Sequence, residues 1–248
     1  MAADLRRWAP AFAAALWAGP AMAAVCGPVD YGNQRYAVCT VAFGEDLRLW
    51  LNGDDGRPMG TFDRLRDWAE RRGLSVEFAM NAGMYHPDRS PVGLYVEEGR
   101  EAAPIVTAGS DDNFGMRPNG VFCVGAERFG ITESRAFAAA PAACRFATQS
   151  GPMLVIDGAL HPRLLPGSDS RNIRNGVGVS GDGRTAWFAV SDRPVTFYEF
   201  ARLFRDGLGA PDALYLDGSV SRLFAPALGR DDTGFPMGPI VGVVVPKG

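Results

Sequence analysis

The sequence has few of the residues on which several common kinds of site depend. It contains only two histidines, His86 and His161, and no Cys-x-x-Cys or Cys-x-x-His spacing. A zinc site needs such closely spaced ligands, so the sequence argues against one. It also lacks the HExxH motif, a calcium-binding EF-hand loop and the Gly-x-Ser-x-Gly elbow of many serine hydrolases. We therefore expect no metal and no other cofactor.

An excess of positive charge is also absent. The 25 Lys and Arg residues are balanced by 28 Asp and Glu residues, which gives a formal net charge of -3. Binding to nucleic acid depends on a positive field that replaces counterions, so we expect no nucleic-acid partner. Beyond the N-terminus, no apolar run approaches the roughly 20 residues that a membrane span needs.

The first 23 residues have the features of a secretory signal. Arg6 and Arg7 precede an Ala-rich apolar run, and Ala21-Met22-Ala23 fits the cleavage pattern of small residues. An uncleaved anchor is the alternative, but prolines and a glycine leave fewer than about ten uninterrupted apolar residues. We predict a signal over 1–23 and a mature domain over 24–248 that is periplasmic or secreted, without stable membrane insertion. We make no prediction for its oligomeric state.

All four cysteines, Cys26, Cys39, Cys123 and Cys144, lie beyond the predicted cleavage point. An even number of cysteines in an oxidising compartment favours disulfides. Three pairings are possible, and we favour Cys26 with Cys39 and Cys123 with Cys144 because each closes a short local loop.

Short strand patterns bounded by turn residues dominate the mature chain, which is rich in glycine (31) and proline (18). Two segments have a helical spacing of apolar residues: 62–72, capped by Thr61, and 197–206, opened by the capping box of Thr196 and Glu199. Hairpins with two helices predict one α+β domain, in which the helices pack on a largely antiparallel sheet. The segment 226–238 is expected to be a surface or site-covering loop. Strands are predicted at 36–43, 47–51, 74–80, 92–96, 101–106, 120–124, 129–133, 153–156, 159–160, 177–180, 185–190, 213–216, 220–224 and 240–245.

Polar residues next to glycine end several of these strands. Glycine lets the backbone approach a ligand closely, and the strand before it fixes the direction of the polar side chain. Each such residue is also an ordinary turn residue, but the apolar Leu214-Tyr215-Leu216 runs directly into a carboxylate, which favours one convergent site. The candidates are Asn81 and Gly83 in NAGMY, Asn119 in RPNGVF, Gln149, Ser150 and Gly151 in TQSGPML, Arg174 and Asn175 in IRNGVGV, and Asp217, Gly218 and Ser219 in LYLDGSVSR.

Five blocks, NAGMY, PNGVF, QSGPMLV, RNGVGV and LYLDGSVSRLF, resemble in order and spacing the bacterial branch of the phosphodiester glycosidase family. The resemblance covers about residues 36–246. It implies a hydrolase that cleaves a sugar of the N-acetylhexosamine kind from a sugar-1-phosphodiester at the anomeric carbon. One departure is Ser219-Val220, where a family enzyme that removes N-acetylglucosamine has two glycines.

The resemblance agrees with the chemistry of the candidates. Cleavage builds positive charge on the sugar and negative charge on the departing phosphate. Arg174 is predicted to bind the phosphate through two nitrogens, and Asp217 to stabilise or attack the anomeric carbon, or to activate water. Asp192, at the end of a predicted strand, is a second catalytic candidate, with a turn-forming role as its alternative.

The remaining candidates would hydrogen-bond the sugar or the phosphate. His161, close behind a predicted strand, is a candidate for acid–base or phosphate contact, although a structural placement is the alternative. Two other kinds of protein stay open: a non-catalytic module that binds cell-envelope glycans or phosphoglycans, and a plain scaffold. The scaffold would be favoured if Asn81, Ser150, Arg174 and Asp217 were scattered over more than about 15 Å, wider than a pocket for one small ligand.

Overall fold

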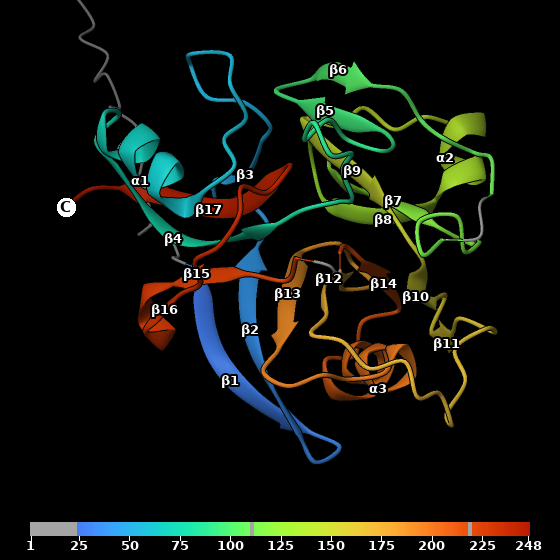
Figure 1. Cartoon of the computed structure of the whole chain (residues 1–248). Helices are drawn as coiled ribbons and strands as arrows, with labels where there is room; N and C mark the ends of the chain where they lie inside the picture. The colour runs from blue at the N-terminus through green and yellow to red at the C-terminus, as the bar shows by residue number, and fades with distance from the viewer. Residues whose placement is uncertain (1–23, 110–111, 218–219) are drawn as a thin grey trace, which may run out of the picture.

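The computed structural model describes residues 24–109, 112–217 and 220–248, and arranges their strands in three antiparallel sheets (Figure 1). The predicted signal segment 1–23 and the candidates Gly218 and Ser219 lie outside the described residues. Sheets with a few helices confirm the α+β class and the antiparallel pairing, although the strands divide among three sheets. Within the described ranges, no helix is long and apolar enough to span a membrane.

The large sheet has seven strands and runs through residues from both ends of the chain. Its order is β1 (Val25–Tyr31), β2 (Gln34–Ala42), β13 (Thr185–Ser191), β12 (Asn175–Val179), β14 (Asp212–Tyr215), β10 (Met153–Ile156) and β11 (Ala159–Leu160). The first of these strands was not predicted. It pairs with β2 along its whole length, from Val25 opposite Thr40 to Tyr31 opposite Gln34.

The other two sheets have five strands each. The β4 sheet has the order β16 (Arg230–Asp231), β15 (Leu223–Ala225), β4 (Leu74–Asn81), β17 (Ile240–Pro246) and β3 (Leu47–Trp50). The β9 sheet has the order β6 (Arg100–Ala103), β5 (Tyr95–Glu97), β9 (Phe146–Ser150), β7 (Gly120–Val124) and β8 (Phe129–Glu133).

Three phenylalanine rings, one from each sheet, meet in the main core. Phe188 of the large sheet lies 5.4 Å from Phe78 of the β4 sheet and 5.7 Å from Phe122 of the β9 sheet, measured between ring centroids. All three side chains are buried. The apolar surface that they remove from water holds the three sheets together.

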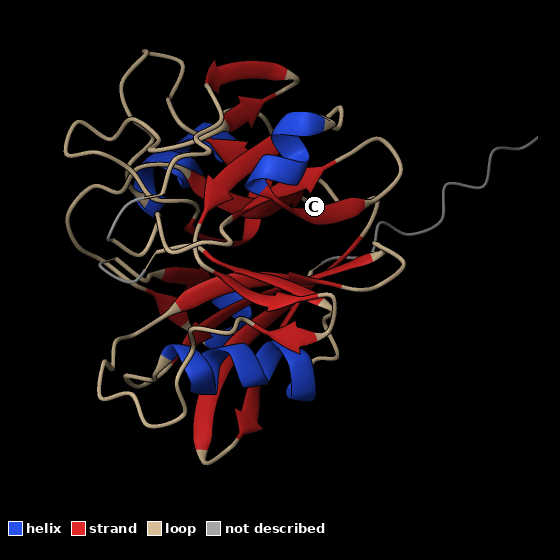
Figure 2. Ribbon diagram, turned by 90° about the vertical axis from the view of Figure 1, so that its right-hand side faces the viewer, coloured by secondary structure: helices blue, strands red, loops and turns tan. Residues whose placement is uncertain are grey.

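Helices cover the outer faces of the sheets (Figure 2). The α1 helix (Phe62–Glu70) packs on β4, and α3 (Phe197–Arg202), continued by a π-helical turn (Leu203–Gly207), packs on the large sheet. Both predicted caps are confirmed: Thr61 accepts from the Arg64 N–H, and Thr196 forms a capping box with Glu199.

Three expectations about local structure were incomplete. Strand β9, which ends at the candidate Ser150, was not among the predicted strands. A third helix, α2 (Ser134–Ala139), begins where the Glu133 carboxylate accepts two main-chain N–H groups, and its six residues are too few to give a periodic signal. The predicted loop 226–238 contains a short 3-10 turn (Pro226–Leu228) and strand β16.

Both favoured disulfides are confirmed. The Cys26–Cys39 bond joins two residues that lie directly opposite each other on β1 and β2, and the Cys123–Cys144 bond ties β7 to the segment before β9. The loops that they close span 13 and 21 residues.

Candidate active site

The Asn175 side chain links two sheets at their strand ends. Its Nδ2 donates to the carbonyl oxygen of Asn81 at 2.9 Å, and its Oδ1 accepts from the main-chain N–H of Asp217 at 2.8 Å. Asn81 and Asn175 are fully buried, and Asp217 is 8% exposed. One amide therefore fixes the end of β4 against the residue two positions after β14. We call Asn81, Asn175 and Asp217 the Asn175 chain.

The third sheet joins the same place through Ser150. Its hydroxyl, at the end of β9, donates to the carbonyl oxygen of Leu216 at 2.6 Å. The carbonyl oxygen and the N–H of the Leu216–Asp217 peptide are thus bound by side chains from two different strands, Ser150 on β9 and Asn175 on β12. Three of the four residues on which the scaffold alternative depended, Asn81, Ser150 and Asp217, are brought together by hydrogen bonds.

Arg174, the fourth, is buried beside this group. Its Cζ lies 3.6 Å from the centroid of the Phe197 ring, its Nε donates to Val195 O at 2.9 Å and its Nη2 donates to Ser170 O at 3.0 Å. Burial lowers the pKa of the guanidinium below its ordinary value. Nη1 has no hydrogen-bond partner among the described residues, and Nη2 keeps a second N–H besides the one given to Ser170. The expected grip on a phosphate through two nitrogens therefore stays a prediction.

Two tyrosines that the sequence did not single out lie near the Asp217 carboxylate. Burial, with the negative charge of Asp217 added, raises the pKa of Tyr85 and raises that of Tyr215 much further. The Arg174 guanidinium opposes the rise at Tyr215, whose ring centroid is 5.6 Å from its Cζ. Both hydroxyls therefore stay protonated and can donate to an anion. Tyr215 stands in an apolar strand, where an aromatic residue predicts only core packing.

Three candidates carry buried nitrogen donors without a hydrogen-bond partner among the described residues: Asn81 Nδ2, Arg174 Nη1 and His161 Nε2. His161 Nδ1 accepts from the Arg163 N–H at 3.2 Å, which leaves the proton on Nε2. Leaving a buried donor unpaired costs about 1–3 kcal/mol, and bound water, strain or a ligand can each account for it. Tyr36 Oη, Glu45 Oε2 and Arg64 Nε, which are not among the candidates, also lack a partner in the described ranges.

Gln149 has a different environment from these three. Its Oε1 accepts from the N–H groups of Leu94 and Val106, both at 2.9 Å, and its Nε2 donates to Ser134 Oγ at 2.8 Å and to Val106 O at 2.5 Å. The amide is fully engaged in holding the segments that flank β9. Gly83 packs against the same strand, because a Cβ there would lie 2.6 Å from the carbonyl oxygen of Gln149.

Asn119 and Gly151 also serve the packing of the loops. Asn119 Nδ2 donates to Phe114 O at 2.9 Å. A Cβ at Gly151 would lie 2.6 Å from Asn119 Cβ and 2.8 Å from Phe114 O, so only glycine allows this close approach.

Asp192 lies at the surface. Its carboxylate, with the side chain 37% exposed, pairs with Arg230 at 3.2 Å and with Arg35 at 4.0 Å.

His161 is buried directly after β11. Burial, and to a smaller extent the Arg163 charge, lower its pKa. No group of three or more His, Cys, Asp or Glu side chains in the described ranges is placed to hold a metal ion.

Comparisons with known proteins identify the family of the chain. A family model described as phosphodiester glycosidase matches residues 75–236. Uncharacterized protein YigE of Escherichia coli K12 is 36% identical over 180 residues, which cover 73% of this chain and 70% of that protein. The catalytic domain of zebrafish N-acetylglucosamine-1-phosphodiester alpha-N-acetylglucosaminidase, auto-inhibited by its pro-peptide, has a similar fold, with a TM-score of 0.62 at 12% identity over 92% of this chain and 84% of that one. The chain belongs to the phosphodiester glycosidase family.

Proposed function

We propose that this chain is an exported hydrolase that releases a sugar of the N-acetylhexosamine kind from a sugar-1-phosphodiester by cleavage at the anomeric carbon. The observation that carries the proposal is the Asn175 chain, which fixes Asp217 where all three sheets meet and beside a buried arginine. Membership of the phosphodiester glycosidase family supports the class of reaction.

Asp217 is the proposed catalytic carboxylate. As the bond between the anomeric carbon and the phosphate oxygen breaks, its electron pair leaves with the phosphate and positive charge develops on the sugar ring. A carboxylate beside that carbon either stabilises the charge and guides the attack of water, or attacks the carbon itself before water displaces it. Either route ends with the water oxygen on the sugar and its proton on the carboxylate or in solvent. The main-chain bond to Asn175 holds the carboxylate in place for this step.

The phosphate is the proposed partner of the buried donors. A phosphate monoester leaves without a proton, so the site needs positive charge more than a second acid. Arg174 supplies this charge away from water, where it acts most strongly, and the Tyr85 hydroxyl and Asn81 Nδ2 add hydrogen bonds. Arg174 is held by Val195 and Ser170 before any ligand arrives, so little entropy is lost on binding.

Export is supported by the two disulfides, since such bonds persist in oxidising compartments. With cleavage after Ala23, the described strand β1 would begin close to the new N-terminus.

A pair of matched substrates tests the proposed reaction. One is N-acetylglucosamine with a methyl phosphodiester at its anomeric oxygen, and the other is the methyl glycoside of the same anomer. We expect release of free sugar from the phosphodiester alone, because only it offers a charged leaving group for Arg174 to stabilise. Equal turnover of both substrates would contradict the phosphate assignment. Binding of the phosphodiester without turnover, in either anomer, would favour the non-catalytic module.

A further inference from the structure

A polar cavity lies apart from the proposed active site. It has a volume of about 550 Å³ and lies between β3, the C-terminal end of α1 and the β5–β6 hairpin. None of its lining residues belongs to the Asn175 chain. Cavities that bind small ligands span roughly 300–1,000 Å³, so this one is large enough for a sugar unit. We call it the β3–α1 groove.

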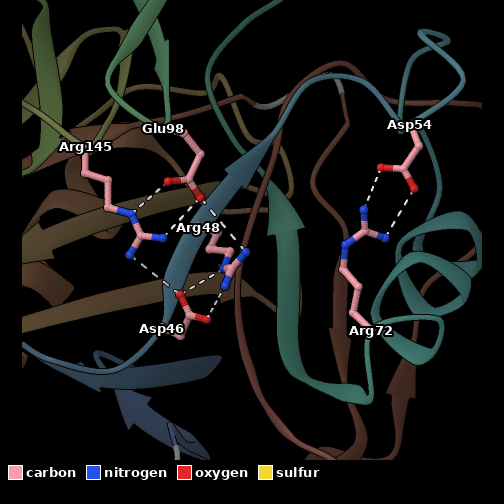
Figure 3. Close-up of polar contacts among 6 residues, drawn as sticks. All are labelled: Asp46, Arg48, Asp54, Arg72, Glu98 and Arg145. Atoms are coloured by element: carbon pink, nitrogen blue, oxygen red, sulfur yellow. Dashed lines mark hydrogen bonds and ion pairs between the residues drawn. The ribbon is translucent and has the colours of Figure 1, made fainter.

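Charges of both signs line the groove in equal number: Arg48, Arg72 and Arg100 against Asp54, Glu97 and Glu98. Most of them are already paired (Figure 3). Arg72 binds Asp54 through two nitrogens, at 2.7 and 3.2 Å. Arg48 and Glu98 belong to a ring of four alternating charges that Asp46 and Arg145 complete. The wall is thus neutral as a whole, and four of its six charged side chains, Arg48, Asp54, Arg72 and Glu98, are held in ion pairs.

The apolar lining of the groove includes two indole rings, which are largely buried. Trp50 and Trp68 pack edge to face, with ring centroids 5.5 Å apart, and the Arg72 guanidinium lies 4.4 Å from the Trp68 centroid. Arg72 Nη1 also donates to Trp68 O at 3.3 Å. A guanidinium held by an aromatic face, a carboxylate and a carbonyl has little freedom left to lose when a ligand binds.

This lining suits a neutral ligand rich in hydroxyl groups. At the paired side chains, an anion or a cation would have to compete with an ion pair for its partner, whereas a hydroxyl group can donate to the carboxylate and accept from the guanidinium of the same pair. We propose that the β3–α1 groove is a second saccharide-binding site, specific for neutral sugar units. The proposal does not depend on the hydrolytic function of the Asp217 site.

Tryptophan positions allow a test that reports directly on the groove. Full-length protein labelled with fluorotryptophan carries five labels, of which Trp8 and Trp17 belong to the segment 1–23. Trp50 and Trp68 line the groove, while Trp187 on β13 lies outside it and serves as an internal control. The neutral probes are maltotriose and the N-acetylated chitin trimer, and the anionic probe is the galacturonic acid trimer. At about 20 mM probe, enough to occupy a millimolar site, we expect a neutral trimer to shift the fluorine resonances of Trp50 and Trp68 and to leave that of Trp187 unchanged.

Two arginines, Arg66 on α1 and Arg72 in the turn that follows it, provide matched variants. Arg72 and Arg66 both lie over an aromatic ring and both pair with aspartate, but only Arg72 lines the groove. We expect Arg72→Ala to weaken binding of the trimer at least about tenfold, and Arg66→Ala to change it by less than about twofold. Asp54→Asn, which removes one carboxylate charge, should weaken binding as Arg72→Ala does.

Three results would overturn the proposal. The first is the absence of any shift of Trp50 and Trp68 with both neutral trimers. The second is a shift with the galacturonic acid trimer alone. The third is equal binding by folded Arg72→Ala, Asp54→Asn and Arg66→Ala proteins. Because no step of the test measures hydrolysis, its failure is separate from a failure of the proposed reaction.

Discussion

Replacing Asn175 with alanine tests whether its amide holds the proposed active site together. The substitution removes the donor to Asn81 O and the acceptor for the Asp217 N–H, which lie 2.9 and 2.8 Å from their partners. Both partner groups would lose the hydrogen bond that Asn175 gives them. Each such group costs about 1–3 kcal/mol, so the expected loss in the free energy of unfolding is roughly 2–6 kcal/mol.

A loss of that size is large, but a typical domain is stable by about 5–15 kcal/mol, so a folded fraction should remain for measurement. Urea unfolding followed by circular dichroism gives the free energy. Hydrolysis of the methyl phosphodiester gives kcat/KM for the folded protein. We expect kcat to fall more than the loss of folded protein explains, because Asp217 would no longer be held by its main chain.

Asn172→Ala is the matched control, since Asn172 is an exposed asparagine three residues earlier. A surface substitution of this kind should change stability by less than about 0.5 kcal/mol. If Asn175→Ala were as stable and as active as Asn172→Ala, the argument that Asn175 positions Asp217 would be refuted.

Three further predictions concern charge, pH and covalent links. Arg174→Lys should lower kcat/KM for the phosphodiester at least about 30-fold, since lysine cannot bind both carbonyls and stack on the ring; wild-type kinetics would contradict this. Burial lowers the pKa of His161 below 6.5. As the pH falls below 6.5, the His161 side chain is therefore protonated in the unfolded chain before it is protonated in the folded one. The free energy of unfolding of the wild type should therefore fall by up to about 1.4 kcal/mol per pH unit below pH ~6.5. His161→Gln should reduce this slope, and the exposed control His86→Gln should keep it. Equal slopes in His161→Gln and the wild type would refute the prediction. Replacing Cys123 and Cys144 together with alanine should cost about 3 kcal/mol in urea unfolding, and an unchanged midpoint and slope would count against this estimate.

Local features of the fold were predictable because they depend on residues only a few positions apart. The Thr61 cap, the Thr196 capping box and the hairpin turn at Asp157-Gly158 are each set by contacts within four residues. The division into three sheets depends on distant pairings, such as Phe188 on β13 opposite Cys39 on β2, for which no local pattern exists.

The candidate site also has features that the local sequence predicts and features that depend on residues far apart in the chain. A polar residue after an apolar strand is visible in the sequence, and the structure brings Asn81, Ser150 and Asp217 together at such strand ends. Whether a side chain faces a ligand or the fold is not visible, since it depends on neighbours far along the chain. Gln149 illustrates this, because its partner Val106 lies 43 residues away. The position of Tyr85 near Asp217 could not be predicted for the same reason.

The most direct test of the central claim is the turnover of Asp217→Asn compared with Asp192→Asn. Both substitutions remove one negative charge and keep the shape of the side chain, but Asp192 pairs with arginines at the surface whereas Asp217 is held by the Asn175 chain. Steady-state hydrolysis of the methyl phosphodiester should show kcat lower by about 10²–10⁴-fold in folded Asp217→Asn. KM should stay near the wild-type value, and Asp192→Asn should keep its activity. Full activity in a folded Asp217→Asn protein would contradict the account, and loss of activity in Asp192→Asn alone would move the catalytic role to Asp192.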